Sequence, residues 1–360
     1  MCVYGDRKGY CGPGRYDGVP DLVYLNQRDG TFRDAAAELG FNKSAGKGLA
    51  VVASDFNDDR KPEIYVANDM TANFLYTRCS DRVTEPAAVC YEDVAGQSGC
   101  AVSGDGMNQA SMGISCADFD GDGKIDIYLT DYYQMKNTLY HNLGEMLFED
   151  DSLRTGVATS SLSYLGFGTW PLDYDSDGDA DLFVANGHVL GSAIEPNAMT
   201  PQLLQNDGKG IFTDVSIRGG EYFQDRWLGR GVAAADFDDD GDTDLTVTHL
   251  DRPVALLMNQ TKKKNERFIG LSLQGINRIP PICARVTVKA SQGRQTQVFS
   301  AGGSYLSTSD SRLLFPLSDA AETAEVEIHW PSGRIDQFGP MPTNRYWTVI
   351  EGRGPVVLPQ

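Results

Sequence analysis

The chain has 360 residues, enough for two or three domains that each bury a hydrophobic core. Hydrophobic residues make up 41 % of it, and 39 glycines and 16 prolines are scattered along its length, so the composition excludes a disordered chain and indicates a turn-rich, β-rich fold. The formal net charge of −19 argues against nucleic acid or an anionic membrane as a partner and favours something cationic.

The start of the chain and its cysteines bear on where the protein is found. No window approaches 18 consecutive apolar residues, so no transmembrane segment is predicted, and residues 1–30 lack the apolar core of a signal peptide. The protein is then either not exported, or numbered after processing or within a longer chain. Six of the seven cysteines lie in the first third without a C-x-x-C motif, which favours local disulfides in an oxidising compartment over zinc sites or buried thiols. The expected pairs are Cys2 with Cys11, Cys79 with Cys90 and Cys100 with Cys116, which leaves Cys283 unpaired.

A repeat organises the residues that follow. Four nine-residue windows align, with starts 63, 55 and 63 residues apart: 55–63 (DFNDDRKPE), 118–126 (DFDGDGKID), 173–181 (DYDSDGDAD) and 236–244 (DFDDDGDTD). Before each window stands a run of small residues that begins near a glycine, and after each window comes an alternating apolar run. The unit is therefore predicted as strand, acidic loop, strand, and one or two further strands. The full units are 46–93, 108–150, 162–215 and 227–273.

The acidic loops predict calcium sites. The four windows hold 19 Asp and Glu residues, and carboxylates crowded in this way repel one another unless a cation neutralises them. Positions 1, 3, 5 and 9 carry oxygen side chains in every copy, whereas position 7 varies, as expected if it contributes its backbone carbonyl; such hard ligands favour Ca²⁺ over zinc or copper. The predicted ligand residues are Asp55, Asn57, Asp59, Lys61 and Glu63; Asp118, Asp120, Asp122, Lys124 and Asp126; Asp173, Asp175, Asp177, Asp179 and Asp181; and Asp236, Asp238, Asp240, Asp242 and Asp244.

The spacing excludes an EF-hand, because position 12 of every copy is Val or Leu instead of a bidentate Glu and the pattern continues as a strand. The first loop departs from the others. Arg60 replaces the glycine at position 6, where a positive φ is expected, and Asn57 and Glu63 replace Asp. We therefore expect three strong calcium sites and a weaker fourth one at 55–63.

The loops resemble FG-GAP/VCBS repeats, which build calcium-binding β-propellers, and the turns NQRDGTF at 26–32 and NDGKGIF at 206–212 resemble the hairpin that closes their blades. Residues 282–351, with CARVTVKAS, VEIHWPSGRIDQF and RYWTVIEG, resemble the ASPIC/UnbV domain, although Cys283 stands where that family has Gly. Both parts in this order resemble the cartilage acidic protein family. The resemblance implies an all-β chain: a calcium-binding propeller over 1–275 and a small β domain over 276–360.

The number of blades stays open. Propellers of this type usually have seven blades, whereas the sequence holds four full units, and residues 16–34 supply only the outer strands of an earlier blade. The ring is then truncated, smaller than seven blades, or closed by a partner.

Polar residues recur thirteen positions after each loop begins, at the end of the strand that leaves it. Because equivalent positions of successive blades lie on one face of a propeller, they would form an arc there; the alternative is that strand ends are polar simply because they meet solvent. His141, in contrast, is interpreted as a packed outer-strand residue. The candidate face residues are Asn68, Asp131, Asn186 and His249, with His188 and Asp251 close by.

Two classes of function follow from these observations. The first is a secreted or periplasmic calcium-binding scaffold that binds a protein or a glycan on the propeller face. The alternative is an enzyme that uses this face, such as a metal-assisted lyase, isomerase or cyclase, because a fold does not settle function. A deep pocket with perturbed acids at the arc would favour the enzyme.

Overall fold

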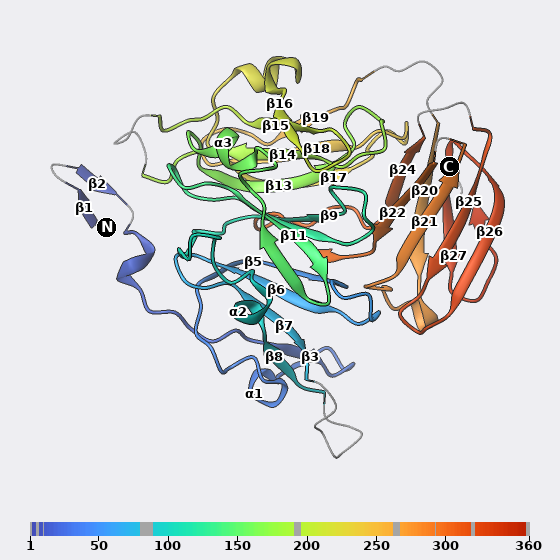
Figure 1. The fold of residues 1–360 in the computed structure, drawn as a ribbon, viewed down its shortest axis with the longest axis horizontal. Coiled ribbons are helices and arrows are strands. Elements are labelled where there is room, and N and C mark those ends of the chain that lie inside the picture. Colours follow the sequence, from blue (N-terminus) through green and yellow to red (C-terminus); the bar gives the residue numbers. More distant parts are fainter. Residues whose placement is uncertain are drawn as a thin grey trace.

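The four acidic repeats fold into four antiparallel sheets that succeed one another as blades do in a propeller, and the all-β, propeller-like fold expected from the sequence is confirmed (Figure 1). The structure is a computed structural model that describes residues 2–4, 7–9, 11–79, 89–190, 196–261, 267–291, 293–317 and 321–357. Within these ranges no helix is long and apolar enough to cross a membrane. The α-helices are single turns: α1 (Ala36–Leu39), α2 (Ala95–Ser98) and α3 (Val157–Ser161).

Each of the first three repeats contributes four strands in chain order to its sheet, and the fourth repeat contributes three; β23 (Ala301–Gly302) is a fifth strand of the first sheet. The first strands of neighbouring repeats contact one another and are called the inner strands. Each acidic loop joins the first and second strands of its sheet. The strands are β5 (Gly48–Ser54), β6 (Glu63–Asn68), β7 (Phe74–Arg78) and β8 (Tyr91–Asp93); β9 (Ile114–Ala117), β10 (Asp126–Leu129), β11 (Thr138–Gly144) and β12 (Leu147–Asp150); β13 (Gly166–Leu172), β14 (Asp181–Asn186), β15 (Gln202–Asn206) and β16 (Phe212–Asp214); and β17 (Gly229–Ala235), β18 (Asp244–His249) and β19 (Ala255–Leu257).

Aromatic and branched side chains fill the spaces between neighbouring sheets. Tyr65 packs with Tyr140 between the first and second sheets, and Tyr128 packs with Phe212 between the second and third. The inner strands carry small residues because they approach one another closely: a Cβ on Gly168 of β13 would lie 2.5 Å from the carbonyl oxygen of Arg230 in β17. The apolar residues that alternate along the strands of each repeat therefore form a hydrophobic core between each pair of neighbouring sheets.

The N-terminal region forms two hairpins outside the four full sheets. The first, β1 (Cys2–Tyr4) with β2 (Arg7–Gly9), precedes a 3₁₀ turn, η1 (Pro13–Arg15). The second, β3 (Tyr24–Asn26) with β4 (Phe32–Asp34), matches the turn predicted at 26–32, and the segment around it packs on the first sheet through Val23 and Phe41. Its two strands form a sheet of their own, as expected for the outer strands of an earlier blade.

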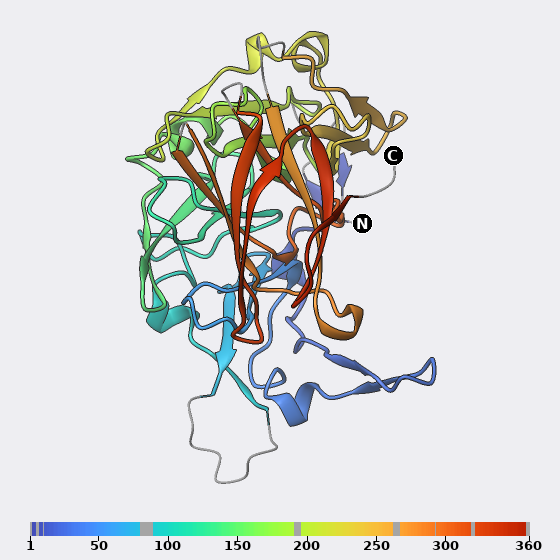
Figure 2. The ribbon, with the colours of Figure 1, turned by 90° about the vertical axis from the view of Figure 1, so that its right-hand side faces the viewer.

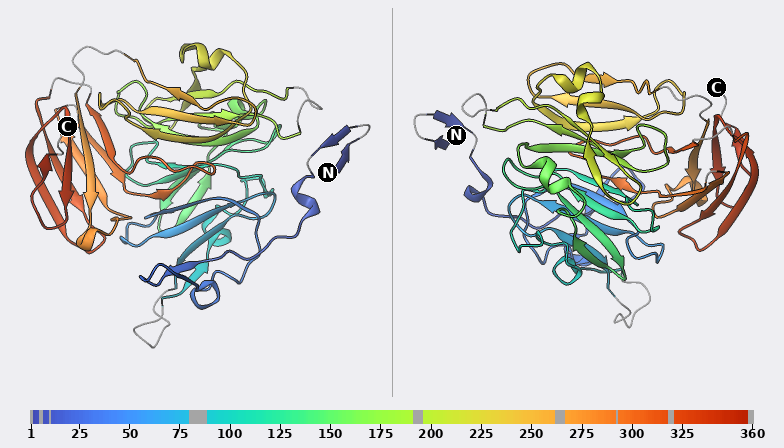
Figure 3. Two further views of the ribbon diagram at one scale, coloured as in Figure 1. Left: turned by 180° about the vertical axis from the view of Figure 1, so that it is seen from behind. Right: turned by 45° about the horizontal axis from the view of Figure 1, so that its top comes forward.

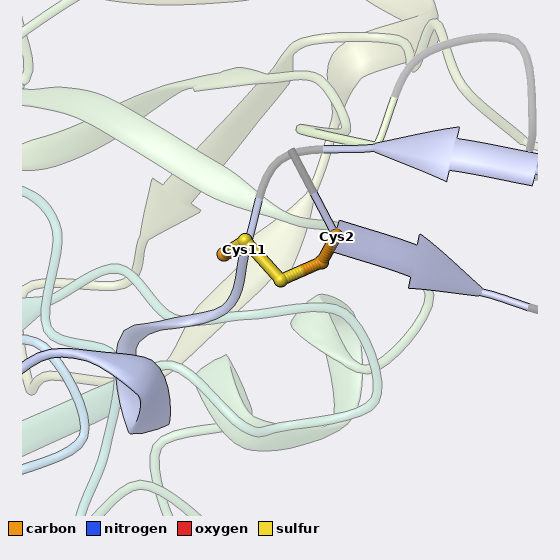
Figure 4. Close-up of a disulfide and its surroundings, with 2 residues drawn as sticks. All are labelled: Cys2 and Cys11. Carbon is orange, nitrogen blue, oxygen red and sulfur yellow. A yellow bond between two sulfur atoms is a disulfide. The ribbon is translucent and has the colours of Figure 1, made fainter.

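Two of the three expected disulfides are confirmed and one is wrong. Cys2–Cys11 closes the first hairpin onto the segment before η1 (Figure 4), and Cys79–Cys90 joins β7 to β8. Cys100 and Cys116 are free thiols: Cys116 is fixed in β9 by its pairing with Ile127, and both sulfur-bearing side chains pack in the apolar core between the first two sheets. Cys283 is also free, as expected.

The C-terminal domain is a two-sheet sandwich that lies to the right of the blades in Figure 1 and faces the viewer in Figure 2. One sheet has the order β24-β20-β27-β28 and the other β22-β21-β25-β26, and Phe315, Ile328 and Trp330 fill the core between them. The strands are β20 (Arg267–Gln274), β21 (Arg285–Ala290), β22 (Gly293–Val298), β24 (Leu313–Leu317), β25 (Thr323–His329), β26 (Ile335–Pro342), β27 (Arg345–Ile350) and β28 (Val356–Val357).

The boundary expected at 275 places β20 in the wrong unit. This strand pairs with β24 and, in parallel, with β27, so the fourth sheet ends with β19 and the C-terminal domain already includes Arg267. Periodicity alone does not distinguish the two placements, because the alternating run RFIGLSLQ suits either sheet.

A segment of the C-terminal domain enters the ring of blades, as the views in Figure 3 show. This central segment, residues 299–312, contains β23 (Ala301–Gly302), which pairs with β5. Ser304 exchanges backbone hydrogen bonds with Ile114 of β9, and Asp310 donates one to Ala234 of β17. The ring of Tyr305 lies 4.9 Å from that of Phe167 in β13. The central segment therefore contacts the inner strand of every full sheet.

Candidate calcium loops and the opposite face

The four acidic loops share one backbone geometry. The position-1 carboxylate accepts a hydrogen bond of 2.8 to 2.9 Å from the position-6 N–H in every loop. The position-9 carboxylate likewise accepts the position-2 N–H at 2.9 to 3.2 Å. Positions 4 and 6 are left-handed throughout, and Arg60 takes this conformation with φ of 69° although it is not glycine. The loops are thus folded alike by hydrogen bonds to their own carboxylates.

Three loops bring carboxylates close enough to hold a metal ion. One oxygen from each member of a triad lies within 4.8 Å of the others in the second, third and fourth loops: Asp118, Asp120 and Asp122; Asp173, Asp175 and Asp181; Asp236, Asp238 and Asp244. In the described part of the first loop no such triad forms, because position 3 is Asn57. Oxygen-only donor sets of this kind suit Ca²⁺.

Burial makes these acids costly to ionise without a cation. It raises the pKa of Glu63 and of Asp181 to about 8, that of Asp173 to about 7 and that of Asp118 to about 6. The Oδ1 atom of Asp118 is buried and has no hydrogen-bond partner. A buried carboxylate oxygen without a donor is unfavourable, so the residues present fit a bound divalent cation.

The third strand adds a side chain to each of the first three loops, a contribution that the motif itself does not indicate. His141 of β11 places Nδ1 3.2 Å from Oδ1 of Asp126 and 3.4 Å from Oδ2 of Asp120. At the same place in their sheets, Thr77 donates to Glu63 and Gln205 donates to Asp175. All three residues lie in the third strand, opposite the position-9 residue of the second strand. Aligning the predicted second and third strands as a hairpin would have identified them from the sequence. His141 is therefore part of the second loop's surroundings and not merely a packed outer-strand residue.

In the second, third and fourth repeats, an asparagine near the end of the third strand joins its sheet to the acidic loop of the repeat before. The backbone N–H groups of Asn142, Asn206 and Asn259 donate to the position-9 carboxylate of their own repeat at 2.7 to 2.8 Å. Their side-chain Nδ2 groups donate to the position-2 carbonyl of the repeat before, at 2.7 to 2.9 Å. These residues couple neighbouring loops mechanically.

We expect Asn206→Ala to lower the free energy of unfolding by about 2–4 kcal/mol, because it leaves the buried carbonyl of Phe119 and the half-buried carbonyl of Ala180 without their donor. The matched control is Asn26→Ala, at the related turn of the exposed β3–β4 hairpin, where the change should stay within about 0.5 kcal/mol. Urea unfolding monitored by tryptophan fluorescence measures both. Equal effects of the two substitutions would contradict the role of Asn206.

The candidate face residues lie at the strand ends remote from the acidic loops, and most are buried. Asn68, Asp131 and Asn186 are at most 1 % exposed and hydrogen-bond mainly to groups of their own repeat. Asp131 accepts three hydrogen bonds, and burial raises its pKa to about 7. His188 is 2 % exposed and Asp251 is exposed.

His249 is held on both ring nitrogens. Tyr222 Oη lies 2.8 Å from Nε2, and Nδ1 lies 2.8 Å from the carbonyl oxygen of Pro253, so Nδ1 carries the proton that this carbonyl accepts. Trp227 stacks on the imidazole with ring centroids 4.7 Å apart. These contacts give His249 a structural position in the fourth repeat.

Half-buried tyrosines gather at the same ends of the strands. They pack on an apolar cluster that includes Phe167 and Met199, and we call them the aromatic face: Tyr132, Tyr133, Tyr164 and Tyr305. Arg230 places its guanidinium 4.0 Å from the ring centroid of Phe167, and burial lowers its pKa to about 10. The tyrosines come from the second and third repeats and from the central segment of the C-terminal domain.

The chain is similar to two family profiles and to several named proteins. The profile described as ASPIC and UnbV matches residues 277–356, and the FG-GAP-like repeat profile matches 118–184 and 173–247. Cartilage acidic protein 1 of Xenopus tropicalis is 25 % identical over 309 residues, which cover 84 % of this chain and 44 % of that protein. The protein of the same name from Homo sapiens is 25 % identical and is covered over 40 % of its length by 74 % of this chain. The chain thus spans less than half the length of these relatives.

A solved structure on the recognition of non-reducing terminal N-acetylglucosamine by an Agrocybe aegerita lectin is 16 % identical, with a TM-score of 0.35 over 67 % of this chain and 60 % of that one. This likeness is too low to indicate a shared ligand. The chain carries FG-GAP-like repeats followed by an ASPIC and UnbV domain, and the resemblance to the cartilage acidic protein family predicted from the sequence is confirmed.

Proposed function

We propose that the chain is a calcium-binding propeller module, outside the cell or in the periplasm, that acts as a scaffold for a protein or a glycan. The observation that carries the proposal is the set of carboxylate triads in three of the acidic loops, at the ends of the strands opposite the aromatic face. Calcium at those loops would fix the blades and leave the aromatic face free to bind. The two disulfides support an oxidising compartment.

The geometry supports a binding module better than an enzyme. An acid or base that acts on a bound substrate must reach it, whereas the carboxylate of Asp131 is buried and takes three hydrogen bonds from the protein. His249 is held through both nitrogens. Half-buried tyrosines, in contrast, supply contact area with little loss of side-chain entropy and a hydroxyl at the rim.

The test screens the calcium-loaded protein against a glycan array and an array of extracellular proteins. We expect hits that Tyr133→Ala and an excess of chelator both abolish, because the first removes a contact and the second loosens the scaffold. The control is Tyr24→Ala, whose side chain is exposed on the β3–β4 hairpin and should leave every hit unchanged. Hits that survive Tyr133→Ala, or that are indifferent to calcium, would reject the proposal.

A further inference from the structure

The C-terminal domain touches the acidic loops themselves. Arg285 donates through Nε to Asp58 in the first loop at 2.9 Å and through Nη1 to the carbonyl of Gly123 in the second at 2.6 Å. Arg312 donates to Asp239 and to the carbonyl of Asp236, both in the fourth loop, at 2.9 Å. Strand β22 and the second, third and fourth loops line a cavity of about 610 Å³. The domain therefore spans the loops while leaving space beside them.

The fourth loop receives a contact of a different kind. The hydroxyl of Tyr346 in β27 donates to Oδ2 of Asp236, the position-1 carboxylate, at 2.6 Å. That oxygen also accepts the N–H of Gly241 at 2.8 Å. Throughout the described residues, the position-1 carboxylates of the other loops, Asp55, Asp118 and Asp173, accept hydrogen bonds from backbone N–H groups alone.

Tyr346 is held rigidly in its own domain. Its side chain lies against Gly270, where a Cβ would come within 2.1 Å of the ring, and its centroid is 5.4 Å from that of Phe268. The guanidinium of Arg312 lies over the ring, 4.3 Å from the centroid. Phe268 also abuts the loop, because a Cβ on Gly241 would lie 2.2 Å from its ring. The ring that carries the hydroxyl is consequently positioned by side chains of the C-terminal domain, and the hydroxyl links that domain to the fourth loop.

We propose that Tyr346 is a positioning residue of the fourth calcium site, so that calcium affinity at this loop and docking of the C-terminal domain form one coupled equilibrium. The inference rests on the proposed function in that the loops bind calcium. Two donors hold Oδ2 of Asp236, and the N–H of Asp240 donates to Oδ1 at 3.1 Å, so the carboxylate is fixed in the triad that it forms with Asp238 and Asp244. Partners that orient a metal ligand from outside typically contribute about 10- to 100-fold in affinity.

Coupling of this kind acts in both directions. If the docked domain tightens calcium binding by a given factor, calcium must stabilise the docked domain by the same factor. Loss of calcium from the fourth loop would then loosen the sandwich and, with it, the central segment that contributes Tyr305 to the aromatic face. Arg285 contacts the first and second loops only at position 4 and position 6, whereas Tyr346 contacts the position-1 carboxylate of the fourth loop.

The test is a calorimetric calcium titration of the chelator-stripped full chain. Tyr346→Phe keeps the ring and its packing but removes the hydroxyl, and we expect one site to weaken by about 10- to 100-fold while the others are unchanged. Tyr76→Phe is the matched control, because it removes a hydroxyl bound to a carboxylate, Asp21, that belongs to no acidic loop. In an Asp238→Ala background, which removes a carboxylate of the fourth triad, Tyr346→Phe should have no further effect on calcium binding.

Hydrogen–deuterium exchange gives a second readout. Calcium should increase protection of residues 345–350 in the wild type and clearly less in Tyr346→Phe. A variant that folds and titrates like the wild type, or one that weakens every site equally, would overturn the coupling while leaving the calcium scaffold intact. A wild-type protein that binds no calcium would instead overturn the proposed function together with the inference.

Discussion

Removal of calcium is expected to lower the melting temperature further than any single substitution. Calcium at about a hundred times its dissociation constant contributes roughly 2.7 kcal/mol per site, so three sites contribute about 8 kcal/mol, which is comparable with the whole stability of an ordinary domain. Thermal unfolding in excess EDTA, followed by readdition of Ca²⁺ or Mg²⁺, measures the effect. Calcium should restore stability and magnesium should not, because Mg²⁺ demands a stricter octahedral shell and keeps its water.

Single-loop variants test which sites matter. Asp177→Ala and Asp240→Ala should each lower the melting temperature in calcium more than Asp59→Ala does, because the first loop lacks a carboxylate triad among its described residues. Elemental analysis of the dialysed protein gives the number of bound ions independently. An unchanged melting curve in EDTA, together with no calcium found by elemental analysis, would contradict the proposed calcium sites.

The loops could be predicted from the sequence because their geometry is local. The position-1 carboxylate bonds to an N–H five residues later and the position-9 carboxylate to one seven residues earlier, so the motif contains nearly all the partners it needs. The strands on either side of each loop could be predicted because apolar and polar residues alternate in the flanking segments. Neighbouring sheets then pack through the apolar positions of those strands.

Contacts between distant segments could not be predicted in this way. The pairing of β23 with β5 joins residues about 250 apart, and nothing in the sequence AGGSYLSTSDS indicates which strand it meets. The Cys100–Cys116 pairing failed for a similar reason, because β9 is held by its ladder with β10. Asn68 and Asn186 lie at the ends of β6 and β14, where the recurrence of polar residues placed them. Periodicity carries no information on whether such a side chain is exposed, and both are buried.

The calcium-free protein is expected to lose stability as the pH rises from about 4 to about 8. Burial raises the folded-state pKa of Glu63 and of Asp181 to about 8 and that of Asp173 to about 7, whereas in the unfolded chain they ionise near their ordinary values. Between those values the folded state binds more protons than the unfolded state, so stability falls with increasing pH. The decline begins near the unfolded pKa values, close to pH 4, and is complete above about pH 8.

Calcium should reverse this trend, because a bound ion compensates the ionised carboxylates and makes the folded state release its protons. Melting temperatures in EDTA and in calcium, at constant ionic strength from pH 4.5 to 8.5, should therefore diverge as the pH increases. Asp181→Asn is the informative variant, because it removes one of the carboxyl groups whose pKa is raised by burial. Its melting temperature in EDTA should fall less steeply with pH than that of the wild type, and calcium should raise it less. A calcium-free protein whose melting temperature rises steadily from pH 5 to pH 8 would show that these carboxylates are stabilised by the protein alone.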